Sequence, residues 1–168
     1  MNEKDVFELL AQMEKENHAK NTFNLGKFFF NEKQDTIKAY LDCEEIVHIP
    51  EGIKYLGPMA FHMINNLREI YITEGVLGIR KQCFWNCSNL HTVHLPQTLK
   101  KIGDEVFRSC YSLSELTLPK SVKEIGNDVF ARCNLQKLVY EGNASDWARV
   151  KMSDETRVAL APLLVCLR

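Results

Sequence analysis

Hydrophobic residues return along the middle of this chain at a fixed step of 23 residues, and phenylalanines mark the step most clearly. The four phenylalanines are Phe61, Phe84, Phe107 and Phe130. Three aliphatic series keep the same step: Ile49, Ile72, Leu95 and Leu118; Ile53, Val76, Leu99 and Val122; and Leu56, Ile79, Ile102 and Ile125. A fixed period of about 20–50 residues indicates one supersecondary unit stacked on copies of itself. The pattern therefore predicts a repeat solenoid.

Each unit is predicted to hold a strand, a tight turn and a short helix. Residues 93–96, V-H-L-P, alternate between apolar and polar, which is typical of a half-buried strand, and the proline ends it. Residues 104–110, D-E-V-F-R-S-C, place Val106, Phe107 and Cys110 on one side of a helical turn. No unit can bury its apolar face alone, so the units must stack.

A glycine recurs between the predicted strand and helix, at Gly57, Gly103 and Gly126. A repeated glycine indicates a positive φ angle or a close approach of two backbones. Arg80 takes this position in the second unit, so we expect an altered turn there.

The repeated pattern I-x-I-P-x-x-V-x-x-I-G-x-x-x-F-x-x-C-x-x-L resembles the BspA-like class of leucine-rich repeat. Four units carry it between Val47 and Tyr140: VHIPEGIKYLGPMAFHMINNL, IYITEGVLGIRKQCFWNCSNL, VHLPQTLKKIGDEVFRSCYSL and LTLPKSVKEIGNDVFARCNL. The last unit is one residue short, between Cys133 and Leu135. The resemblance implies an α/β repeat solenoid of about four to five coils that binds proteins or surface ligands.

The two ends depart from the repeat and are expected to cap the solenoid, since end coils otherwise expose their core and strand edges. Three regions follow: a cap over residues 1–45, the leucine-rich repeat solenoid over 46–140, and a cap over 141–168.

The N-terminal region is expected to combine a helix with a β-hairpin. Apolar residues recur at helical spacing within residues 2–18, and Phe28–Phe30 and Ile37–Leu41 form the expected hairpin. The apolar positions of the helix are Val6, Leu9, Leu10 and Met13. As an alternative, this helix is itself a docking element.

The C-terminal region is expected to hold a short helix and a strand. Asn143 or Ser145 is placed to cap a helix containing Trp147 and Val150, and residues 162–168 form the strand that closes the last coil.

Composition and charge exclude several function classes. The 168 residues are 45% hydrophobic and carry a net charge of −1, so we expect no general attraction to nucleic acid or to anionic membrane. No apolar run approaches the roughly 18 residues that span a bilayer. The start, MNEKDVFELL, is no secretory signal, which predicts a cytoplasmic protein if Met1 is the native start and a secreted or cell-surface one if it is not.

Three of the six cysteines follow the repeat, which favours a packing role. Cys87, Cys110 and Cys133 occupy the position that Ile64 holds in the first unit, so the position is apolar. Paired C-x-x-C spacings typical of zinc sites are absent. Cys83 lies four residues before Cys87, which leaves a metal- or thiol-dependent sensor as an alternative. We expect no metal and no cofactor.

Two columns of outward-pointing residues are candidate partner-binding sites. The first lies at the same strand position in successive units: His48, Tyr71, His94 and Thr117. The second follows each repeated phenylalanine and has a composition favoured at binding hot spots: His62, Trp85, Arg108 and Ala131. The alternative for the first column is ordinary solvated sheet surface. The alternative for the second is that Trp85 lies over a neighbouring coil at the margin of the core. A further row, Lys54, Lys100, Lys101 and Lys123, is expected to be solvated.

No catalytic motif is present, because the carboxylates are scattered across the units and no G-x-S-x-G, phosphate-binding glycine loop or H-E-x-x-H occurs. We therefore expect a non-enzymatic, small leucine-rich repeat protein that binds another protein sterically, as an adaptor or inhibitor. The alternative is a fragment or relative of a bacterial cell-surface adhesin.

Overall fold

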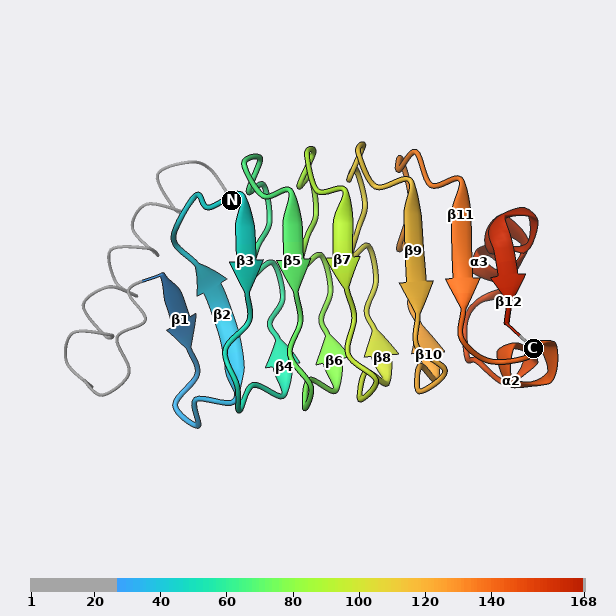
Figure 1. Cartoon of the computed structure of the whole chain (residues 1–168), viewed down its shortest axis with the longest axis horizontal. Helices are drawn as coiled ribbons and strands as arrows, with labels where there is room; N and C mark the ends of the chain where they lie inside the picture. The colour runs from blue at the N-terminus through green and yellow to red at the C-terminus, as the bar shows by residue number, and fades with distance from the viewer. Residues whose placement is uncertain (1–26, 168) are drawn as a thin grey trace.

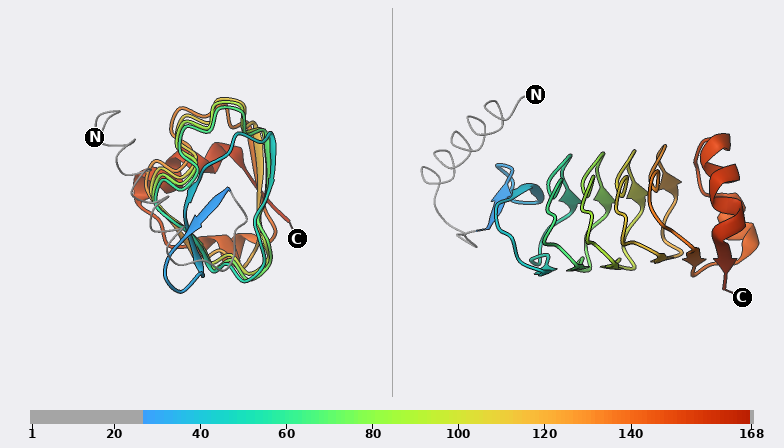
Figure 2. Two further views of the ribbon diagram at one scale, coloured as in Figure 1. Left: turned by 90° about the vertical axis from the view of Figure 1, so that its left-hand side faces the viewer. Right: turned by 90° about the horizontal axis from the view of Figure 1, so that it is seen from above.

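The computed structural model describes residues 27–167, which wind into successive coils stacked along one axis (Figure 1). Viewed along this axis, the coils lie over one another, and each has three sides (Figure 2). We call them the strand side, the short-strand side and the turn side. The predicted N-terminal helix over residues 2–18 lies outside the described residues.

In the repeated coils, the strand side carries strands of three or four residues, whose side chains alternate between inward and outward positions. These strands are β3 (Ile46–His48), β5 (Glu69–Tyr71), β7 (Thr92–His94), β9 (Glu115–Leu118) and β11 (Lys137–Tyr140). Strands β3, β5 and β7 pair in parallel, and β9, β11 and β12 (Leu164–Cys166) form a separate parallel sheet. In this second sheet, Lys137 lies opposite Glu115, which is 22 positions earlier in the chain and not 23. The pairing is therefore shifted by the one residue that the last unit lacks.

The short-strand side is one continuous sheet. Its members are β4 (Tyr55–Leu56), β6 (Gly78–Ile79), β8 (Lys101–Ile102) and β10 (Glu124–Ile125), paired in parallel. At the first coil, β2 (Thr36–Tyr40) continues the sheet and folds back antiparallel onto β1 (Phe28–Phe30). The predicted hairpin is therefore present.

The turn side contains no helix in the described coils, so the short helix predicted in each unit is wrong. Left-handed residues interrupt the segment, with φ of 55° at Glu105 and 61° at Ser109. The peptide groups then point along the stack: the Phe84 N–H donates to the Val106 carbonyl at 3.0 Å, and the Phe107 N–H donates to the next coil in the same way. An α-helix would use these groups within its own turn.

The recurring glycines mark close backbone approach, and they do not have a positive φ angle. A Cβ added to Gly103 would lie 2.8 Å from the Lys81 backbone nitrogen, and one added to Gly126 would lie 2.5 Å from that of Asp104. The altered turn expected at Arg80 is absent, since its N–H donates to the preceding coil at 2.9 Å as the glycine N–H groups do.

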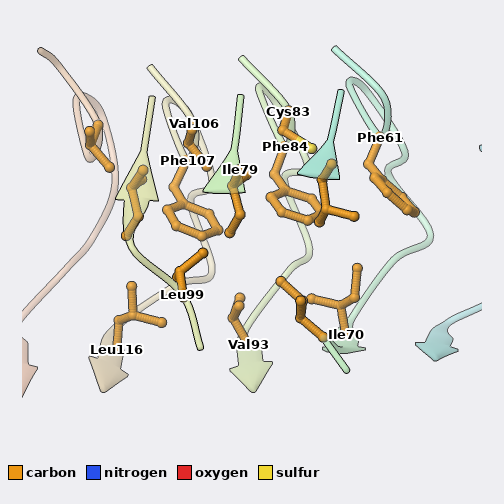
Figure 3. Packing of buried hydrophobic residues seen from close by; sticks show 14 of the residues in the cluster. Phe61, Ile70, Ile79, Cys83, Phe84, Val93, Leu99, Val106, Phe107 and Leu116 are labelled. Atoms are coloured by element: carbon orange, nitrogen blue, oxygen red, sulfur yellow. The ribbon is translucent and has the colours of Figure 1, made fainter. Parts of the chain in front are cut away.

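The core is a column of stacked aromatic rings surrounded by the aliphatic series (Figure 3). Ring centroids lie 5.2 Å apart between Phe61 and Phe84, 5.5 Å between Phe84 and Phe107, and 5.7 Å between Phe107 and Phe130. Tyr40 of the hairpin continues the column with a centroid 5.2 Å from that of Phe61. The predicted phenylalanine ladder is confirmed, although Phe130 is only partly buried.

The C-terminal residues pack two short helices and a strand against the last coils. These elements are α2 (Ala144–Ala148), α3 (Asp154–Leu160), the 3-10 helix η1 (Ala161–Leu163) and β12. Asn143 caps α2 as predicted, by accepting a hydrogen bond from the Asp146 N–H, and Trp147 packs against Tyr140. Val150 lies just beyond α2 rather than within it. Within residues 27–167, no helix has the length and apolar character needed to cross a bilayer.

Candidate functional site

Three stacked rings form the outer surface of the strand side. His48, Tyr71 and His94 occupy equivalent positions of β3, β5 and β7, and we call them the ring ladder. The centroids of the first two rings are 4.5 Å apart and those of the last two 4.1 Å apart, with interplanar angles of 9° in both pairs. Because strands alternate, the preceding residues point into the core. They are Val47, Ile70 and Val93.

Glu69 holds the end of the ring ladder in place. Its Oε1 lies 2.8 Å from His94 Nε2. This hydrogen bond, and after it the interaction with the Tyr71 hydroxyl, lowers the pKa of the Glu69 carboxyl. The carboxylate thus fixes the orientation of the imidazole, whose side chain is still 46% exposed.

The backbone pairing of the strand side is interrupted between β7 and β9, which belong to different sheets. One coil earlier, the Ile72 N–H donates to the His94 carbonyl at 3.0 Å. The corresponding N–H of Leu95 has no such partner on β9 among the described residues. Likewise, the Arg68 carbonyl accepts hydrogen bonds from the next strand, but the corresponding His91 carbonyl accepts none there. Two strand edges therefore face each other unpaired (Figure 1).

A groove of about 390 Å³ lies along this interruption. We call it the β7–β9 groove. Its lining residues are His91, Thr92, Val93, His94, Leu95, Gln97, Glu115, Leu116, Thr117, Pro119 and Glu141. The volume falls in the lower part of the range of small-molecule pockets, about 300–1,000 Å³.

The groove divides the predicted column of four residues. His48, Tyr71 and His94 form the continuous ring ladder, whereas Thr117 stands across the groove on β9. The break between β7 and β9 therefore separates the last member of the column from the other three. The ladder ends where the groove begins, so one surface contains both.

Among the described residues that line the groove, two carry carboxylates, Glu115 and Glu141, and none is lysine or arginine. Glu115 pairs with Lys137, which lies outside the lining, at 2.9 Å. Glu141 accepts a hydrogen bond of 2.6 Å from the neutral Gln97 side chain and has no ion pair within the described part of the chain. The groove is thus an acidic site beside an aromatic surface.

The second predicted column lies on the turn side and is brought together only in part. The rings of His62 and Trp85 are parallel, with centroids 6.2 Å apart and an interplanar angle of 1°. Arg108 instead lies 3.3 Å from Glu105 and 3.8 Å from Asp128. All four residues of this column, Ala131 included, are half-buried. Trp85 thus lies against the neighbouring coil, and Arg108 already has carboxylate partners.

The repeat cysteines act as core residues with a specific hydrogen bond. The Cys87 thiol donates to the Phe61 carbonyl, and the Cys110 thiol donates to the Phe84 carbonyl. Burial raises the pKa of Cys87 to about 12 and that of Cys83 well above its usual range. Within residues 27–167, no three His, Cys, Asp or Glu side chains are grouped so as to hold a metal ion.

Several residues of this surface were not predicted from sequence. Strand alternation places Glu69 and Tyr71 on the same face of β5, so the pairing of Glu69 with His94 could have been predicted from the sequence. The groove gives no sequence signal, because β9 repeats the same pattern as β7. Glu115 and Glu141 therefore join the site only in three dimensions.

The sequence matches the model of one family of repeat proteins. Residues 37–149 match six copies of a family model described as "BspA type Leucine rich repeat region". A search of curated proteins gives no match.

Solved structures with a similar fold come from several bacteria. A leucine-rich repeat protein of Bacteroides capillosus is 25% identical, with a TM-score of 0.64, over 73% of this chain and 100% of that one. A leucine-rich repeat protein of T. pallidum is also 25% identical, with a TM-score of 0.54 and 71% of each chain covered. A leucine-rich cell surface protein of Faecalibacterium prausnitzii is 18% identical, with a TM-score of 0.61, over 74% of this chain and 40% of that one.

Proposed function

This chain belongs to the BspA-type leucine-rich repeat family, and from that membership we propose that it is a non-enzymatic module that binds another protein. The partner occupies the strand side, over the ring ladder and the β7–β9 groove. The observation that carries this proposal is the continuity of the two: three exposed stacked rings lead directly into an acidic groove.

The chemistry of this surface supports protein binding. Aromatic side chains are enriched at the centres of protein interfaces, because they bury a large area and lose few rotamers. The ring ladder is held by stacking and by Glu69, so its rings need little ordering when a partner arrives. The module then acts by covering or bridging its partner, as an adaptor or inhibitor.

The turn side is the weaker of the two candidate surfaces. Arg108 has two carboxylates within 4 Å, and binding a partner would require breaking these ion pairs. The His62–Trp85 pair is half-buried against the coils. Met63, which follows His62, and Tyr111, three residues after Arg108, are 51% and 49% exposed.

The two surfaces can be separated by affinity capture with matched variants. Wild-type protein, the strand-side variant His48→Ala/Tyr71→Ala/His94→Ala and the turn-side variant Trp85→Ala/Arg108→Ala are immobilised and used to enrich partners from an extract of the source organism. A partner enriched by the wild type is then purified and titrated against all three proteins by calorimetry.

We expect the strand-side variant to lose at least about 2 kcal/mol of binding free energy and the turn-side variant to bind as wild type. Circular dichroism establishes that each variant is folded. Full binding by the strand-side variant, with loss in the turn-side variant, would assign the site to the turn side instead.

A further inference from the structure

We infer that the β7–β9 groove receives an arginine side chain of the partner, whose guanidinium stacks on the His94 ring and pairs with the Glu141 carboxylate. This inference rests on the proposed function, because it names the group that the strand side recognises.

The ring ladder determines where a planar group can be added. One face of the His94 ring is covered by Tyr71, at a centroid distance of 4.1 Å and an interplanar angle of 9°. Tyr71 lies on the β5 side, so the other face of the His94 ring points toward β9 and the groove. Thr117, at the next position of the column, brings no ring, so the stack has an open end. A flat group inserted there continues the ladder.

Charge determines which flat groups are favoured. Glu115 and Glu141 line the groove, and no lysine or arginine of the described part of the chain does. Glu115 is already neutralised by Lys137, whereas the Glu141 carboxylate is bonded, within residues 27–167, only to the neutral amide of Gln97. An incoming cation therefore gains an ion pair with Glu141 without displacing another cation from it. An anionic or neutral planar group would gain no such pair.

The guanidinium fits both requirements better than the ammonium of lysine. It is planar, stacks on rings and presents several N–H donors in one plane, whereas an ammonium is a compact and strongly hydrated charge. The unpaired edges of β7 and β9 add backbone acceptors such as the His91 carbonyl, to which remaining N–H groups can donate. Stacking, charge and donor geometry thus point to arginine.

The test titrates the ¹⁵N-labelled 168-residue chain with Nα-acetyl-L-arginine amide at pH 7.5 and follows amide shifts by NMR. Nα-acetyl-citrulline amide is the uncharged control of equal shape. Nα-acetyl-lysine amide, whose side-chain ammonium stays charged, is the non-planar cation. We expect saturable shifts at residues 91–95, 97, 115–118 and 141, with a Kd on the order of 1–10 mM. Citrulline and lysine are expected to bind at least about fivefold and about twofold more weakly, respectively.

Three variants locate the probe within the groove. His94→Ala and Glu141→Gln should each weaken arginine binding by about two- to fivefold, because one removes the stacking face and the other the charge. Glutamine keeps an oxygen that can accept from Gln97, so the fold around position 141 is preserved. Glu51→Gln, which neutralises an exposed carboxylate that is not part of the groove lining, should leave arginine binding unchanged.

Each outcome decides the inference. Shifts of equal size with citrulline, shifts spread outside the groove, or unchanged binding in folded His94→Ala and Glu141→Gln variants would overturn it. If the groove ignores arginine while the strand-side variant still loses the partner, the inference fails and the proposed function stands. If the strand-side variant keeps the partner, the proposed function fails, whatever the probe does.

Discussion

Phe84 shows how one residue type organises the whole core. Its ring lies fully buried between those of Phe61 and Phe107, in contact with two other coils. Stacked rings contribute beyond the area that they bury, by roughly 0.5–1.5 kcal/mol for each pair. A single phenylalanine therefore stabilises its own coil and both neighbours.

We expect Phe84→Ala to lower the free energy of unfolding by about 3–5 kcal/mol, because it leaves a cavity between three coils. Urea denaturation measures the change. Phe130→Ala is the matched control: this ring is only partly buried at the end of the column and should cost less. Equal losses at both positions would contradict the role assigned to the column.

Gly103 is required by space rather than by backbone conformation. Gly103→Ala places a methyl group 2.8 Å from the Lys81 backbone nitrogen, so we expect a loss of about 1–3 kcal/mol in stability. Arg80→Ala is the control, because Arg80 holds the same repeat position and already carries a Cβ. Thermal unfolding compares the two. A neutral Gly103→Ala would show that the coils can separate there at little cost.

The buried thiols are expected to be unreactive in the folded protein. The pKa of Cys87 is raised to about 12, so its thiolate is rare at pH 8, whereas Cys43 is exposed. A disulfide reagent at pH 8 should modify Cys43 at once and Cys83, Cys87 and Cys110 only after unfolding. Since the folded pKa exceeds the unfolded one, Cys87 disfavours the folded state as pH rises from about 9 toward 12. Rapid labelling of Cys87 without denaturant would contradict this packing.

At the scale of elements, hydrogen bonds between coils replace those within a helix. The 23-residue pattern predicted the strand and turn positions well, but it predicted a helical turn where the turn side has none. Apolar spacing alone cannot distinguish a helical turn from a chain of left-handed turns that buries the same side chains. The difference lies in where the N–H groups donate, which the neighbouring coil decides.

The break between β7 and β9 should be visible in hydrogen exchange. The Ile72 N–H donates to the next strand, whereas the equivalent Leu95 N–H has no partner there. We expect the Leu95 amide to exchange at least about tenfold faster than those of Ile49 and Ile72. Ile49 is an internal control, because its N–H donates to Tyr71 at 2.9 Å. Equal protection of Leu95 and Ile72 would mean that β7 and β9 pair through their backbones in solution and that the groove is transient.

At the scale of the whole molecule, the stack is a linear series in which each coil contacts its neighbours. The coils share one shape when viewed along the axis, which follows from their common period (Figure 2). Such an architecture tolerates the loss of a complete coil better than the loss of a part of one.

Deletion of residues 68–90, one full period, should leave a protein that still unfolds cooperatively at a lower urea concentration. The deletion joins Leu67 to His91, so every later residue keeps its side of the coil. Deletion of residues 68–79, about half a period, shifts inward residues outward and should prevent folding. Circular dichroism and urea melts compare the two variants. A folded half-period variant would contradict a repeat held by its register.

The sequence by itself determined the period, the solenoid, the core residues and the outward position of the ring ladder. Each of these depends on the spacing of side chains along one chain, and that spacing is visible without coordinates. Only the tertiary structure decided the turn-side geometry, the separation of Thr117 from His94 and the groove between them. These depend on hydrogen bonds between coils, and two coils of the same pattern can pair or part without any change in that pattern.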